Sequence, residues 1–286
     1  MRSRGVALAV AAALLAGCGG DEPRAPAQPP AAAQDGPQHV HGLGVNPADG
    51  ALYIATHSGL WRTPRGETRP QRVGEIRHDL MGFTVAGPDE FLASGHPAPD
   101  DRRLPPHLGL QRSTDGGRSW RAVALLGRAD LHVLRAQGRH VYGIDSTSGR
   151  LLASRDGGRS WQRRDLPAPA FDLVVAPGAP QRLIAATERG LFASRDGGRG
   201  WRVLREDATG LLAWPAADSL YFAASDGSVT RSADGGRTFD YMGSSDMALQ
   251  AFAAAGPSVL LASGHGGEVR ESRDGGATWD IRSAAG

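Results

Sequence analysis

The sequence predicts an all-β fold, a six-bladed β-propeller built from four-stranded antiparallel blades. Three observations predict it. A short segment containing Asp-Gly-Gly recurs five times, at intervals of 38 to 41 residues. Many of the 40 glycines in the 286 residues fall at these fixed positions, which indicates repeated tight turns. Short runs of strand-forming residues lie between the turns. A period near 40 residues with several short strands per unit is typical of propellers.

Each repeat is centred on one aspartate. The first complete copy, residues 113–120, reads Ser-Thr-Asp-Gly-Gly-Arg-Ser-Trp. The aspartates of the five copies are Asp115, Asp156, Asp196, Asp234 and Asp274. Residues 59–68 resemble the stretch around the first copy without its aspartate, which brings the number of repeats to six.

The repeat divides into four expected strands. In the fourth repeat these are residues 171–176, 182–187 and 190–194, with the last strand beginning at 201. The Asp-Gly-Gly segment is then the turn between the third and fourth strands. An aspartate accepts hydrogen bonds from backbone N–H groups in such a turn, and glycine adopts positive φ without strain. These segments therefore predict turn architecture in preference to sugar binding.

The motif S-x-D-G-G-x-[ST]-W resembles that of Asp-box (BNR) repeat proteins, which include sialidases, sortilin-type receptors and photosystem II assembly factors. The resemblance covers residues 42–282 and implies the propeller fold. Segments HVHGLGVNP, DLMGFTVAG and ASGHP are also similar to bacterial lipoproteins that are often labelled glycosyl hydrolases. Unrelated activities share this fold, so the resemblance implies no single function.

The N-terminus is typical of a bacterial lipoprotein. Arg2 and Arg4 precede an apolar stretch that is too short to span a bilayer and ends in Leu-Ala-Gly-Cys18, which resembles a lipobox. We expect a signal peptide at 1–17, a lipid on Cys18, and an extracytoplasmic protein anchored to the bacterial membrane. Residues 18–38 are rich in Ala and Pro and predict a disordered tether. Residues 39–286 are the predicted propeller.

Composition argues against a nucleic-acid partner and against a disulfide bond. The chain has 32 basic and 30 acidic residues, and every basic residue is an arginine. These arginines are scattered, which argues against a nucleic-acid partner. Cys18 is the single cysteine, so no intramolecular disulfide forms. We expect a monomer.

Seven of the nine histidines are predicted at one rim of the propeller, where each innermost strand begins and each second strand ends. The loops after the second strands align His57, His96, Asp145, Glu188, Asp226 and His265. At or just before the starts of innermost strands lie His39, His41, His78, Asp79 and His132. Only His107 and His140 are expected elsewhere.

Imidazoles gathered from several blades predict a transition-metal site, with Zn or Cu as the expected ion. The candidate ligands are His41, His57, His96, His132 and His265, with Asp79 and Glu188 as further ligands or as partners that fix the imidazole tautomers. Met81 is either a soft ligand or a channel-packing residue. In the alternative interpretation, these side chains are rim residues hydrogen-bonded to loop backbone.

The sequence favours a binding or scaffold module over an enzyme. The resemblance to sialidases implies an arginine triad, an Asp acid/base and a Tyr–Glu pair. The early Arg-Ile-Pro segment of those enzymes is missing, and no glutamate partners Tyr53, Tyr142, Tyr221 or Tyr241. Other glycosidases need two positioned carboxylates, and nothing in the sequence marks such a pair. A sialidase-like glycosyl hydrolase or a metal-dependent enzyme using the same rim stays the alternative.

The expected partner is an unidentified protein or small ligand at this rim. Residues 95–108 form an insertion in the second repeat beside the histidines. It is either a lid or partner loop, or a tolerated surface insertion.

Overall fold

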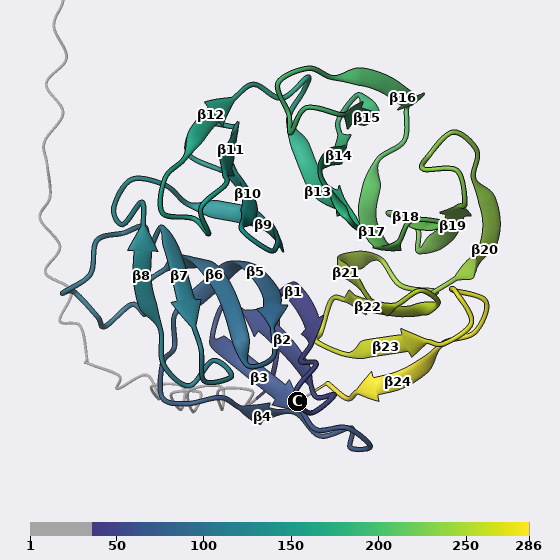
Figure 1. The fold of residues 1–286 in the computed structure, drawn as a ribbon. Helices are drawn as coiled ribbons and strands as arrows, with labels where there is room; N and C mark the ends of the chain where they lie inside the picture. Colours follow the sequence, from purple (N-terminus) through teal and green to yellow (C-terminus); the bar gives the residue numbers. More distant parts are fainter. Residues whose placement is uncertain (1–35, 286) are drawn as a thin grey trace, which may run out of the picture. The chain divides into compact units, whose positions relative to one another are not determined.

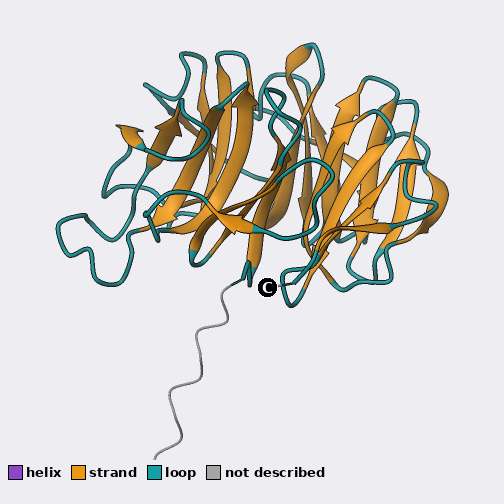
Figure 2. Ribbon diagram, turned by 90° about the horizontal axis from the view of Figure 1, so that it is seen from below, coloured by secondary structure: helices purple, strands orange, loops and turns teal. Residues whose placement is uncertain are grey.

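The structure is a computed structural model that describes residues 36–285. Within this part of the chain, 24 strands form six four-stranded sheets and no helix is present. The sheets stand in a ring around a central channel, with the first strand of each sheet innermost (Figure 1). Seen from the side, the elements are strands joined by loops (Figure 2). The predicted six-bladed propeller is therefore confirmed.

Each blade is one continuous stretch of chain. Blades one and two contain β1 (Val40–Val45), β2 (Leu52–Thr56), β3 (Gly59–Thr63), β4 (Gln71–Arg72), β5 (Asp79–Gly87), β6 (Glu90–His96), β7 (Leu110–Ser113) and β8 (Arg121–Ala124). Blades three and four contain β9 (Leu131–Gln137), β10 (His140–Asp145), β11 (Arg150–Ser154), β12 (Gln162–Arg164), β13 (Ala170–Ala176), β14 (Ala179–Thr187), β15 (Gly190–Ser194) and β16 (Arg202–Glu206). Blades five and six contain β17 (Gly210–Ala216), β18 (Ser219–Ala224), β19 (Ser228–Ser232), β20 (Asp240–Ser244), β21 (Leu249–Gly256), β22 (Val259–Gly264), β23 (Val269–Ser272) and β24 (Asp280–Ser283).

The predicted signal peptide, Cys18 and most of the predicted tether lie outside the described residues. Pro37, near the end of that tether, is buried, and its carbonyl lies against Gly267 of the last blade. Packing contacts thus begin before residue 39. Among residues 36–285, no helix is long and apolar enough to cross a lipid bilayer.

The hydrophobic core is divided among the six interfaces between neighbouring blades. Each of six apolar clusters combines buried side chains from two adjacent sheets. The cluster between the first and last blades, for example, contains Ile54 and Trp61 together with Leu261 and Val269. Burial of apolar surface between blades therefore stabilises the ring as well as each sheet.

The Asp-Gly-Gly segments connect the third and fourth strands of blades two to six. In the first of them, Asp115 accepts hydrogen bonds from Ser119 N at 3.0 Å and from Ser113 Oγ at 2.8 Å. The other four turns repeat this pattern. Gly117 has a φ of +84°, and a Cβ there would lie 2.3 Å from Leu60 Cδ2 of the preceding blade. The turn thus connects two strands of its own sheet and also packs against the preceding blade.

Within residues 36–285, no strand is exchanged between blades to close the ring. Polar contacts near the end of the last blade hold it to the end of β3 and to the loop that follows. Thr63 Oγ1 and Ser283 Oγ lie 2.8 Å apart, and Ala284 N donates to the Thr68 carbonyl at 2.8 Å. The Arg282 guanidinium donates to the carbonyls of Thr63 and Glu67, each at 3.1 Å.

Five of the six innermost strands have a bulge near their start. In β1, Val40 pairs with Thr56 and Gly42 pairs with Ala55, so His41 is left out of the pairing. The residues left out in this way are His41, Met81, His132, Phe171 and Gln250. All five line the central channel, whose volume is about 940 Å³. A bulge redirects the side chain of the extra residue, and here it forms a ring of side chains at the channel mouth.

Candidate metal centre at the channel mouth

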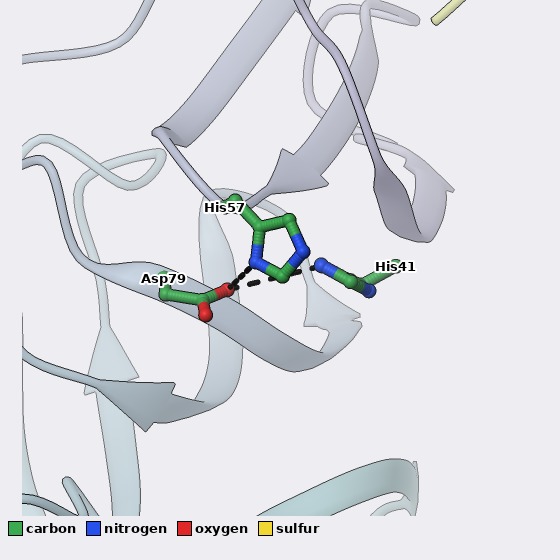
Figure 3. Close-up of side chains that lie close together, drawn as sticks. All are labelled: His41, His57 and Asp79. Carbon is green, nitrogen blue, oxygen red and sulfur yellow. Dashed lines mark ion pairs between the residues drawn. The ribbon is translucent and has the colours of Figure 1, made fainter. Parts of the chain in front are cut away.

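A first group of potential ligands joins blades one and two. His41 comes from the bulge of β1, His57 from the loop after β2, and Asp79 from the start of β5. Asp79 Oδ1 lies 2.8 Å from His57 Nδ1 and 3.8 Å from His41 Nε2. The carboxylate faces both rings (Figure 3). The three potential ligand atoms all lie within 4.8 Å of one another.

A second group joins blades two and three. His96 ends β6, Asp130 directly precedes β9, and His132 occupies the bulge of β9. Asp130 Oδ2 lies 2.7 Å from His132 Nε2 and 3.2 Å from His96 Nε2. These three ligand atoms also lie within 4.8 Å of one another.

The spacing in both groups suits metal coordination. Two donors held at tetrahedral angles on one zinc ion, with bonds of 2.0–2.1 Å, lie about 3.3 Å apart. The contacts of 2.7 to 3.8 Å in the two groups fall around that value. Each group offers two imidazole nitrogens and one carboxylate, which is a donor set that Zn and Cu accept.

His96 connects the two groups. Its Nδ1 lies 3.4 Å from Asp79 Oδ2, while its Nε2 lies 3.2 Å from Asp130 Oδ2. The order of contacts is therefore His57, Asp79, His96, Asp130 and His132 across three blades. A network of this kind positions each imidazole through its neighbouring carboxylate.

His41 is poised to act as a neutral ligand. Burial, followed by the repulsion of the neighbouring His57, lowers the pKa of His41 to about 4, although Asp79 acts in the opposite direction. Its Nε2 atom is buried without a hydrogen-bond partner among the described residues. An unpartnered polar atom in a buried position costs free energy, and a metal ion bound to this nitrogen would remove that cost.

Asp130 is held as a carboxylate. Burial acts to raise the pKa of Asp130, but hydrogen bonding to His132 and Ser146 and the nearby imidazoles outweigh it and bring the value to about 2. The hydroxyl of Ser146 donates to Oδ2 at 2.7 Å. The backbone N–H of Asp130 donates to Asp145 Oδ1 at 3.0 Å. The carboxylate is thus charged and its orientation is fixed.

Two predicted ligands lie outside both groups. His265 Nδ1 lies 3.0 Å from the side-chain amide nitrogen of Gln250, and the ring is exposed. Glu188 is exposed, and its backbone N–H donates to the Pro169 carbonyl. Among residues 36–285, neither side chain belongs to a group of three potential ligand atoms within 4.8 Å of one another.

Among the histidines outside the two groups, one lies at a position that the sequence did not predict. His107, expected elsewhere, lies beside the second group, with its ring centroid 5.8 Å from that of His96. The insertion after β6 folds back and brings it there. The His39 ring lies 5.2 Å from that of His57. His78 Nδ1 accepts a hydrogen bond from the backbone of Ala98.

The insertion after β6 is anchored beside the site. The Leu108 N–H donates to the Gly95 carbonyl at 2.8 Å, and Leu108 is almost fully buried. With His107 near His96 and Ala98 held by His78, this loop packs along one side of the second group.

Two carboxylates predicted near the rim have structural partners. Asp145 accepts hydrogen bonds from the hydroxyls of Thr147 and Ser148 and from the backbone of Asp130. Asp226 accepts one from the Ser228 N–H within its turn. Asp145 supports the site through Asp130, whereas Asp226 closes a loop.

Three of the four tyrosines pack between blades. Tyr142 and Tyr221 donate their hydroxyl protons to the carbonyls of Pro180 and Pro257 in the next blade, each at 2.8 Å. Tyr53 is buried against Phe91 of blade two, and Tyr241 is exposed. The tyrosines thus have interblade or surface positions, which disfavours a sialidase-type nucleophile.

No family model and no curated protein matches the chain. Solved structures do match. A GH74 enzyme from Niastella koreensis has a TM-score of 0.64 and 14% identity, over 86% of this chain and 45% of that one. The GH74 xyloglucanase from Xanthomonas campestris has a TM-score of 0.57 and 19% identity, over 87% of this chain and 46% of that one. YCF48 bound to D1 peptide has a TM-score of 0.55 and 17% identity, over 87% of this chain and 83% of that one. This chain is a propeller. It spans less than half the length of the two GH74 structures.

Sequence reasoning missed Asp130. A usable signal was present, because Asp130-Leu131-His132 has the same Asp-Leu start as Asp79-Leu80-Met81 in the previous repeat. Aligning innermost strands on this pair would have placed a second carboxylate at the rim.

Proposed function

We propose that the protein is a metal-binding propeller that holds a divalent transition-metal ion, Zn or Cu, at its channel mouth. The ligands are His41, His57 and Asp79. The observation that carries the proposal is the buried Nε2 of His41, which lacks a hydrogen-bond partner among the described residues and lies 3.8 Å from Asp79 Oδ1. That separation is too long for a hydrogen bond and suits two ligands of one ion.

The protein acts, in this proposal, as an extracytoplasmic lipoprotein tethered through Cys18. The sequence Leu-Ala-Gly-Cys18 after an apolar stretch supports this placement. A monomeric propeller on a tether presents its channel mouth to an unidentified protein or small ligand. The exposed Phe171, which lines the channel, offers an apolar contact to such a partner. The YCF48 structure bound to D1 peptide is a propeller precedent for a peptide ligand.

The test is metal retention by the purified full chain. The protein is incubated with Zn²⁺ or Cu²⁺, desalted and measured by elemental analysis. We expect the wild type to retain metal, and the double variant His41→Ala/His57→Ala to retain less. His140→Ala is the matched control, because His140 begins β10 outside both groups. Wild-type protein that retains neither ion would end the proposal.

A glycoside hydrolase is the second candidate. The two carboxylates Asp79 and Asp130 at the mouth and the likeness to GH74 enzymes favour it. Against it, both carboxylates contact the His96 ring, which lies where a glycosidase needs space for its substrate and for water. Release of reducing ends from xyloglucan, abolished by both Asp79→Asn and Asp130→Asn, would support the hydrolase and displace the metal module.

A further inference from the structure

We propose that the channel mouth binds two metal ions and that Asp79 couples them through His96. The inference rests on the proposed function and deepens it. The first ion takes His41, His57 and Asp79. The second takes His96, Asp130 and His132, a group that shares no ligand atom with the first.

The contacts of His96 assign its two nitrogens to different tasks. Its Nδ1 faces Asp79 Oδ2 at 3.4 Å, and its Nε2 faces Asp130 Oδ2 at 3.2 Å. A metal-binding imidazole commonly donates its second N–H to a carboxylate, which fixes the tautomer and increases the basicity of the ligating nitrogen. Donation from Nδ1 to Asp79 therefore leaves the Nε2 lone pair directed at the second group.

Asp79 consequently has one oxygen for each group. Oδ1 lies 2.8 Å from His57 Nδ1, within the first group, and Oδ2 lies beside His96. The same carboxylate is a ligand of one ion and the orienting partner of a ligand of the other.

The charges of the region suit two cations. Asp79 and Asp130 contribute one carboxylate to each group. Asp145 is almost fully buried, and its Oδ1 accepts the backbone N–H of Asp130, so it adds negative charge behind the second group.

The two groups also lie on different pairs of blades. The first joins blades one and two, and the second joins blades two and three. Blade two contributes Asp79 and His96, which face each other in the register of β5 and β6. Coupling therefore passes through one pair of adjacent strands, without requiring motion of a whole blade.

The experiment is metal stoichiometry and affinity, measured on the full chain by isothermal titration with Cu²⁺ and Zn²⁺. We expect two ions per wild-type chain, one in His57→Ala and one in His132→Ala. Asp79→Ala is expected to lose the first ion and to bind the second 10- to 100-fold more weakly than His57→Ala does, because it also removes the partner of His96. His140→Ala should bind two, and circular dichroism checks the folding of each variant.

A second readout uses the Cu²⁺ form. Electron paramagnetic resonance of the wild type should show dipolar broadening from two neighbouring ions, and His132→Ala should show an isolated ion. One ion per wild-type chain, lost in both His57→Ala and His132→Ala, would overturn the pair and leave the proposed function standing. Equal affinity for the remaining ion in Asp79→Ala and His57→Ala would overturn the coupling. Absence of metal in the wild type would instead remove the proposed function.

Discussion

His41 shows how a single residue can be unfavourable for folding and favourable for binding. Its imidazole is mostly buried, its pKa is lowered to about 4 by burial, and its Nε2 lacks a hydrogen-bond partner among the described residues. The unpartnered Nε2 costs stability in the metal-free protein, and the lowered pKa adds a cost only below about pH 6.5, where the imidazole of the unfolded chain is protonated. Sites with this combination commonly exchange stability for function.

Replacing His41 by leucine separates the two effects. We expect His41→Leu to leave the free energy of unfolding of the metal-free protein unchanged or to raise it by up to about 1 kcal/mol, because an apolar side chain of similar size removes the unpartnered nitrogen. Metal retention should fall. Denaturant titration with elemental analysis checks both. If His41→Leu instead lowered the free energy of unfolding as well as the metal retained, His41 would be a packing residue.

Asp115 illustrates a carboxylate that stabilises through its turn. Burial acts to raise its pKa, but hydrogen bonds from Ser119 and Ser113 outweigh it and lower the value from 3.8 to about 2. A lowered folded-state pKa contributes stability above the unfolded-state value, and this contribution is lost as the pH falls from about 4 to about 2.

The corresponding prediction concerns thermal melting against pH. Asp115→Asn should lower the melting temperature at pH 7 by a few degrees. The difference from the wild type should shrink as the pH approaches 2, because the wild-type carboxyl is then protonated as well. Asp100→Asn, on the exposed insertion, is the control and should match the wild type. A difference that persists at pH 2 would mean that the charge is not what matters.

At the scale of elements, the sequence predicted strands and turns better than it predicted the site. In the fourth repeat the expected third strand, 190–194, matches β15, and the other boundaries differ by three residues or fewer. Strands follow from local apolar patterns and turn residues, which a sequence displays directly. The sequence also predicted one rim for His41, His57, Asp79, His96 and His132, and the structure places all five in the two groups there.

The departures arise from features that local patterns do not encode. The bulge that turns His132 into the channel depends on cross-strand register, and this bulge places it beside Asp130. His265 occupies an equivalent loop, yet its ring meets Gln250, which holds the bulge position of β21 that His41 holds in β1. His107 reaches the site through the fold of an insertion, which has no counterpart in the other repeats.

Glycine in the repeated turn has a packing role that can be measured. Gly117→Ala should lower the free energy of unfolding by about 2–4 kcal/mol, since the new Cβ meets Leu60 and the residue must also keep positive φ. Gly138, with a φ of +57° and open space around it, is the matched control, and Gly138→Ala should cost only about 1–2 kcal/mol. Equal costs in urea unfolding would show that the interblade contact is unimportant.

At the scale of the whole molecule, polar links cross the blade interfaces as well as apolar clusters. Asp172 in blade four is almost fully buried and lies 2.6 Å from Arg135 Nη2 of blade three. Its other oxygen accepts the Leu212 N–H of blade five at 2.8 Å. Burial raises the pKa of Asp172 despite the attraction of Arg135. One carboxyl group thus ties three blades together.

Removing that carboxyl group should loosen the ring. Asp172→Ala is expected to lower the free energy of unfolding by about 3 kcal/mol, because Arg135 and the Leu212 N–H lose their partner. The double variant Arg135→Met/Asp172→Leu should lose less, since no unpaired charge remains. Both are measured by urea unfolding at pH 7. A double variant less stable than Asp172→Ala would show that the pair itself stabilises the protein.

Because every sheet is formed by an unbroken segment and the ring closes through side-chain and backbone contacts such as Thr63 with Ser283, no blade depends on strands from both ends of the propeller. A rearranged gene that opens the chain between β12 and β13, within residues 165–169, and links residue 285 to residue 36 would leave all six sheets undivided. Circular permutation is therefore compatible with this architecture, and the order in which blades are synthesised becomes an experimental variable.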